Sequence, residues 1–140
     1  MCARPTVITY TDVNARDLRF PTPADLLVNV EADLAITDGD RIVFAERAFP
    51  IAELARGLTR WVATGGGDDF AFDSMSYEDP GSVRVARRPD GWAFGSDFTP
   101  EVWSEPLSWD EVLVTVEAFA QEVRTDLRAL GLDPAPVDLS

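Results

Sequence analysis

Histidine and lysine are both absent from this chain of 140 residues, and cysteine occurs once, as Cys2. Without histidine, neither Ser-His-Asp and Cys-His nucleophilic centres nor histidine-containing zinc sites can be built. Without lysine, Schiff-base chemistry and the phosphate-binding P-loop are excluded as well. A single cysteine forms no internal disulfide, so nothing in the sequence requires an oxidising compartment. Any chemistry must come from carboxylates, arginines, hydroxyl groups and the two tyrosines.

Long apolar runs are missing too. No stretch approaches the roughly 20 residues that span a bilayer, and the first residues lack the apolar core of a secretion signal. We therefore expect a cytoplasmic protein. The apolar fraction of 46% is still enough for a core, and the length suits one domain. We expect a single α+β domain over residues 1–131 and an extended tail over 132–140, where two prolines prevent a further helix.

Negative charge dominates the composition, with 25 acidic residues against 12 basic ones and a formal net charge of −13. Residues 65–140 hold 16 of the acids and five of the arginines, so the acidic field belongs to the second half. Such a field repels nucleic acid and anionic membrane surfaces, and it attracts cations. We expect a basic protein as the partner, with no nucleic acid and no membrane; the oligomeric state stays open.

Hydrophobic periodicity predicts three strands and a helix in the first half. Residues 6–13 are β-branched and aromatic, residues 28–37 have apolar side chains at the even positions, and residues 41–47 return after a turn signal at Asp38-Gly39. We expect a loop or a short helical turn between the first two strands. Apolar residues with helical spacing follow Pro50, and the Gly65–Gly67 run ends that helix.

The second half predicts three short strands over 69–77, 82–88 and 92–98, joined by turns at Asp79-Pro80-Gly81 and Asp90-Gly91. A last helix of about 23 residues begins at Ser108, which forms a capping box with Glu111. The element order β-β-β-α-β-β-β-α indicates the α+β class: an antiparallel sheet of five to six strands with two helices packed on one face.

The predicted turns also fix a register for the second half, which places Met75 and Asp97 opposite Arg84. The helices would then cover Phe72, Val83, Val85, Phe94 and Phe98. The other face would hold Ala71, Asp73, Met75, Arg84, Ala86, Arg88, Ala93, Gly95 and Asp97. Arg84 can pair with Asp97 and, diagonally, with Asp73, while the small residues leave a shallow trough. This face is either a solvated structural surface or one that receives a partner.

Several motifs resemble sites but fit structural roles better. The Gly65–Gly67 run closes a helix and precedes two aspartates, so it does not suit a phosphate. "TDGDR" has the first ligands of a calcium loop but Ile42 at the fifth position, which favours a hairpin. Pairs of carboxylates could perform acid-base catalysis, but a chain with 25 acids offers many such pairs. We predict no catalytic residue, no metal site and no cofactor.

The tryptophans divide into two pairs. Trp61 lies on the apolar stripe of its helix and Trp92 beside a turn, so we expect both in the core. Trp103 and Trp109 flank the entry to the last helix, and we expect one of them to be partly exposed. An exposed tryptophan there is either part of a packed loop or the aromatic anchor of an interface.

The stretch "VEADLAITDGDR", the helix "IAELARGLTRWV" and "DFAFDSMSYEDPGSVRVARRPDGWAFGS" together resemble small acidic actinobacterial proteins of unassigned function. More loosely, they resemble immunity proteins of polymorphic and contact-dependent toxin systems. The resemblance covers residues 26–130 or so, and its most specific part is "FDSM" followed by a hairpin and "DGW". It implies an antiparallel α+β domain without known enzymatic activity. For immunity proteins it also implies an acidic surface that blocks a basic toxin.

The sequence thus favours a non-enzymatic immunity or inhibitor protein whose acidic surface covers a basic partner. An enzyme that uses paired carboxylates or bound Mg²⁺ is the first alternative, and a DNA mimic with acids spaced like phosphates is the second. The predicted contact residues are Asp68, Asp69, Asp73, Glu78, Asp79, Arg84, Asp97, Glu101, Trp103 and Glu105.

Overall fold

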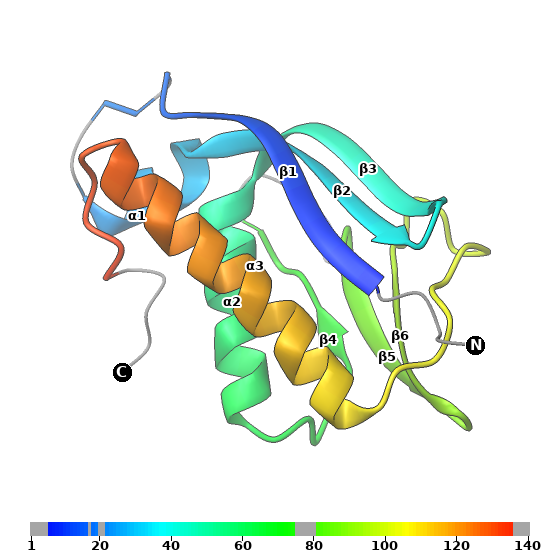
Figure 1. Cartoon of the computed structure of the whole chain (residues 1–140). Helices are drawn as coiled ribbons and strands as arrows, with labels where there is room; N and C mark the ends of the chain where they lie inside the picture. The colour runs from blue at the N-terminus through cyan, green and yellow to red at the C-terminus, as the bar shows by residue number, and fades with distance from the viewer. Residues whose placement is uncertain (1–5, 17, 20–21, 75–80, 136–140) are drawn as a thin grey trace.

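The structure is a computed structural model that describes residues 6–16, 18–19, 22–74 and 81–135. The described residues form two antiparallel sheets, each of three strands, together with three helices, which confirms the α+β class (Figure 1). The elements are β1 (Thr6–Asn14), α1 (Pro23–Asn29), β2 (Glu31–Asp38), β3 (Arg41–Pro50), α2 (Ile51–Ala63), β4 (Phe70–Ala71), β5 (Arg84–Arg88), β6 (Gly91–Gly95) and α3 (Trp109–Ala129).

The first sheet has the order β1-β2-β3 and follows the predicted alternation. Its even-numbered residues from Ala32 to Ile36 are buried, and Asp38 pairs with Arg41 across the hairpin turn. The single sheet of five to six strands was wrong, because the backbone ladder stops at β3. Two register shifts in the pairing of β2 with β3 bend that strand, and its far edge meets a loop, where the Thr99 hydroxyl donates to the Val43 carbonyl at 3.5 Å.

A third helix, α1, replaces the predicted loop and the start of the second strand. The prediction that the strand begins at Val28 was wrong, because that residue lies in α1 and β2 begins at Glu31. The side chain of Thr22 caps the helix by accepting from the Asp25 N–H, and Pro23 occupies the first turn. These start signals outweigh an apolar alternation that only happens to continue across the helix end.

The second sheet has the order β4-β5-β6, but its register differs from the predicted one. Arg84 lies opposite Ala71 and Gly95. The predicted partner Met75 was therefore wrong by four residues, and the predicted partner Asp97 was wrong by two. The two-residue turn is Pro89-Asp90, and Gly91 is the first residue of β6, where it pairs with Arg88. Glycine suits this position because a Cβ atom there would lie 2.5 Å from the Leu107 carbonyl oxygen. Since both shifts are even, almost every side chain keeps its predicted face.

One exception to the predicted faces is Phe98, which was expected under the helices. It is 51% exposed and its ring lies against Phe44, with 5.9 Å between ring centroids. Within the described part of the predicted strand, residues 69–74, Phe70–Ala71 is the part that forms a strand, and Met75 and Tyr77 lie outside the described residues.

The two long helices pack together under the first sheet and join both sheets in one core (Figure 1). α2 buries the predicted stripe that includes Leu54, Leu58 and Trp61, and it ends at the glycine run. The capping box of Ser108 and Glu111 is present at the start of α3. Within the described ranges, no helix combines the length and the apolar character of a membrane span. The predicted tail is described only as far as residue 135.

Candidate functional site

Trp103 fills part of the trough that the sequence predicts on the second sheet. Gly95 is buried, and a Cβ atom on it would lie 2.6 Å from the Trp103 ring. The guanidinium of Arg88 stacks on the same ring, 4.3 Å from its centroid, and the indole N–H donates to the Pro100 carbonyl at 2.8 Å. The small residues therefore receive a tryptophan of this chain, and Trp103 remains partly exposed at the surface.

The predicted ion pair of Arg84 and Asp97 is present, with 3.1 Å between Nη1 and Oδ1. Asp97 also packs against Gly81, where an added Cβ would lie 2.1 Å from its carboxylate. Arg84 is partly exposed and Asp97 is exposed, and Asp73, two residues after the end of β4, is exposed as well. An exposed pair of this kind contributes about 0.2–1 kcal/mol, so it holds the loop in place without acting as a strong staple.

The loop that carries Glu101, Trp103 and Glu105 is fixed to both sheets. It runs along β6, where Trp92 and Leu107 exchange two backbone hydrogen bonds of 2.8 and 2.7 Å. The Asp38 carboxylate accepts from the Glu105 N–H at 2.7 Å and pairs with Arg41 at 3.3 Å. Arg41 in turn donates to the Trp103 carbonyl. Hydrogen bonds to both sheets thus fix the backbone of the loop that carries Glu101 and Glu105.

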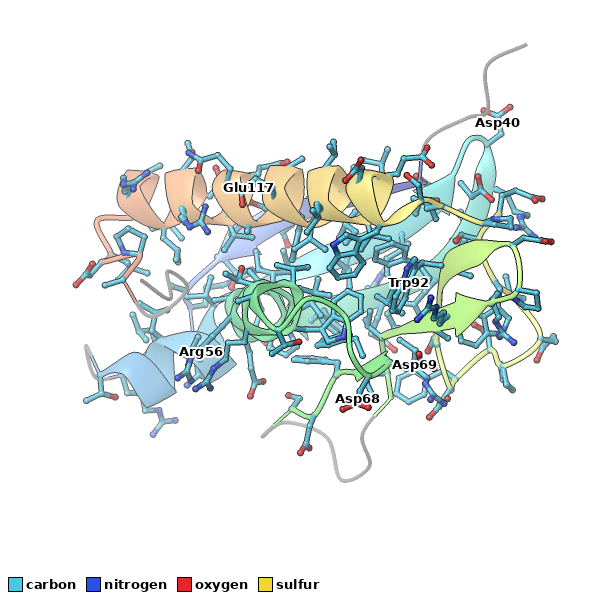
Figure 2. All side chains as sticks on the ribbon, turned by 90° about the horizontal axis from the view of Figure 1, so that it is seen from below. Asp40, Arg56, Asp68, Asp69, Trp92 and Glu117 are labelled. Carbon is cyan, nitrogen blue, oxygen red and sulfur yellow. The ribbon has the colours of Figure 1, made fainter. Side chains whose placement is uncertain are left out.

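The acids of the 68–79 stretch lie elsewhere. Asp68 and Asp69 are exposed in the connection between α2 and β4 (Figure 2). Asp69 accepts from the Arg87 N–H at 3.0 Å, and the Asp68 carbonyl accepts from the Trp61 indole at 2.7 Å. Glu78 and Asp79, which the sequence also predicts as contacts, lie outside the described residues.

Acidic residues follow one another along the chain from the predicted loop into the last helix. Residues 101–123 contain six acids and no basic residue. All six are exposed, and they are Glu101, Glu105, Asp110, Glu111, Glu117 and Glu122. Arg124 is the first base after them; it pairs with Glu117 at 3.5 Å while its own side chain is only 11% exposed. We call residues 101–123 the acidic segment.

Sequence reasoning missed the outer face of α3, the helix that carries four of the six acids of the acidic segment. Val114 is 70% exposed there, and three surface cavities of about 260, 200 and 680 Å³ all include it in their linings. The sequence did contain a signal, because Leu113, Val114 and Ala118 fall outside the buried stripe of the helix. Apolar residues out of phase with the core mark a second face.

A tyrosine joins the other end of α3 to the first sheet. The Tyr10 O–H donates to Asp126 Oδ2 at 2.5 Å, and its ring packs edge-on against Phe119. Burial raises the pKa of Tyr10 well above its ordinary value, and the hydrogen bond to the Asp126 carboxylate adds to the rise. The bond holds the C-terminal half of α3 against the first sheet, and the Thr115 hydroxyl, which donates to the Thr6 carbonyl at 3.2 Å, holds its N-terminal half.

A polar cavity of about 230 Å³ lies beside α2 and β4, where the carboxylates of Glu53 and Asp73 line it together with Arg56 and Arg60. Glu53 is buried and accepts from the Ser74 hydroxyl. This is a place where the carboxylate-enzyme hypothesis can be tested by substitution. In the part of the chain that the structure describes, no three acids or cysteines gather as they would around a metal ion.

The chain belongs to the family described as Domain of unknown function (DUF7878), whose family model matches residues 7–129. The match spans both sheets and all of α3, so the acidic segment lies inside the family domain. Searches of curated proteins and of solved structures found no match.

Proposed function

We propose that this protein is a non-enzymatic binding module of the immunity or inhibitor type, which covers a basic surface of a partner protein in the cytoplasm. The observation that carries the proposal is the acidic segment: six exposed acids within residues 101–123 and no base among them. An excess of acids accelerates encounter with a partner of the opposite sign and disfavours other acidic proteins, and the three arginines that contact the segment, Arg41, Arg88 and Arg124, leave it acidic overall.

The fixed loop supports the same proposal. Because the Asp38 carboxylate and the Arg41 guanidinium hold its backbone, Glu101 and Glu105 lose little conformational freedom when a partner binds. A surface that is ordered before binding avoids part of the entropic cost of association. Trp103, half-exposed between these two acids, adds an aromatic side chain of the type that is enriched in binding hot spots.

The test is capture of a partner from a lysate of the source strain at about 50 mM and then about 500 mM salt, which shortens the Debye length from roughly 14 to 4 Å. We expect a basic protein that is retained at low salt and weakened at high salt. A variant with Glu101→Gln and Glu105→Gln should retain less of it. The matched control, Asp68→Asn with Asp73→Asn, removes the same charge from the other acidic region.

Capture of no basic protein at either salt concentration would refute the proposal. If only the control variant loses capture, the binding function stands, but the binding surface is the region of Asp68 and Asp73 after α2 and not the acidic segment.

A further inference from the structure

The outer face of α3 carries an uncharged strip that the core does not use. Val114, Ala118 and Gln121 follow one another at spacings of four and three residues and are all exposed. At about 100° per residue, this strip points roughly opposite to the buried stripe of Val112, Val116, Phe119, Val123 and Leu127. An exposed valine in mid-helix contributes nothing to the core and has a lower helix propensity than alanine. The fold gives no reason for it.

Acids flank the strip on both sides. By the same geometry, Asp110 and Glu117 form a row on one side, where Arg124 pairs with Glu117 at 3.5 Å, and Glu111 and Glu122 form a row on the other. Figure 2 shows Glu117 on α3, at the opposite side of the molecule from Asp68. Val114 and Ala118 therefore form an apolar centre between two acidic rows, the arrangement of core and rim found in protein interfaces.

The surface is also hollowed around Val114. One cavity reaches towards Leu107 at the start of the helix, and another lies between α3 and β1, where it is lined by Val7 and Ile8. The third, of about 680 Å³, lies over Leu113 and Ala118. Hollows beside an exposed side chain can receive the knobs of a facing helix.

We infer that the outer face of α3 is the docking site for a cationic amphipathic helix of the partner, an inference that rests on the proposed function and specifies its contact. From Asp110 to Glu122 the face is about 18 Å long, which matches some 12 residues of a helix. Apolar residues at i, i+4 and i+7 of that helix would meet Val114, Ala118 and Gln121, and its flanking Lys and Arg would meet the two acidic rows.

A second copy of this chain does not fit the site. Pairing two such faces would bring the rows of Asp110 and Glu117 and of Glu111 and Glu122 against their own kind. Like charges in an interface disfavour association. The charge of the rows thus selects a cationic occupant over a self-complementary one.

The test uses a synthetic peptide of about 18 residues made of leucine, alanine and lysine, with its leucines at helical spacing. Binding to the whole chain is measured by fluorescence anisotropy at about 50 mM salt. Val114→Gln should weaken binding about tenfold, since it removes the apolar centre without changing charge. Glu117→Gln with Glu122→Gln should weaken it several-fold through charge alone.

The matched control is Asp12→Asn with Asp90→Asn, two exposed acids outside the predicted contacts, which should change the affinity less than twofold. Circular dichroism checks that every variant keeps its helices, and Val114→Thr replaces Val114→Gln if that variant does not fold. Absence of binding would overturn the inference, as would equal loss in the control or no effect of the valine substitution. Self-association that depends on Val114 would also overturn it. Capture of a basic protein that is insensitive to Val114 would remove this docking site and leave the proposed function standing.

Discussion

Gly66 sits against Trp109 at the base of α3, and an alanine there should destabilise the fold in a way that an alanine at Gly65 does not. Both glycines have positive φ, 72° for Gly66 and 83° for Gly65. A Cβ at Gly66 would lie 2.7 Å from the Trp109 ring, whereas one at Gly65 meets nothing within 4 Å. Trp109 itself packs against Trp61 and Trp92, each with 5.3 Å between ring centroids, so it cannot move freely.

The two substitutions share one cost and differ in another. Placing alanine in the left-handed region costs about 1–2 kcal/mol at either position. At Gly66 the clash with a packed tryptophan adds about 1–3 kcal/mol, the usual range for overpacking. We therefore expect Gly66→Ala to reduce the free energy of unfolding by about 2–5 kcal/mol and Gly65→Ala by about 1–2 kcal/mol.

Urea denaturation followed by tryptophan fluorescence measures both values, because three indoles of one cluster report on unfolding. The difference should vanish in a Trp109→Leu background, which completes a double-mutant cycle. Equal losses for the two alanine variants in the unmodified chain would refute the contact, as would an unchanged difference without Trp109.

Three further substitutions test other contacts of the same elements. Tyr10→Phe should cost about 1–2 kcal/mol by losing the bond to Asp126. Because the pKa of Tyr10 is raised on folding, the stability that it contributes is present below pH 10 and is lost above it, and Tyr10→Phe should flatten this fall in denaturation curves measured from pH 8 to 11. Ser108→Ala should lower the free energy of unfolding by about 1 kcal/mol in thermal denaturation, because the Ser108 side chain accepts from the Glu111 N–H. Ser108→Asp should retain most of this stabilisation, since aspartate can accept the same bond. Trp103→Ala should cost about 2 kcal/mol and make alanine tolerated at Gly95, whereas equal costs of Gly95→Ala with and without Trp103 would contradict the packing.

Local signals in the sequence were enough for the elements whose partners lie nearby in the chain. The cap at Ser108, the stripe of α2 and the hairpin closed by Asp38 and Arg41 all depend on spacings of a few residues, and the structure contains each of them. The even shifts of register in the second sheet follow the same logic. Burial selects one face and tolerates a slip by two or four residues, so the faces were predictable while the partners were not.

Contacts between distant segments decided the rest. That Asp38 holds the Glu105 backbone 67 residues away follows from the tertiary fold, and no local pattern encodes it. The division into two sheets likewise depends on bulges in β3, which appear only when β2 pairs with it.

The predicted acids illustrate the same limit. The sequence grouped them by proximity along the chain, around residues 68–79 and 101–105, and left out the exposed acids of α3 that follow the second group. A helix presents a face through residues three and four apart. The acids of α3 and Val114 can therefore be recognised as one exposed face only once the buried face is known. The phase of Val114 against the core stripe is a signal that sequence alone contains, and it points to a face with no structural task within this chain. Substitution of Val114 therefore separates binding from folding most directly. Because its side chain is exposed, we expect the substitution to weaken partner binding with little effect on the free energy of unfolding.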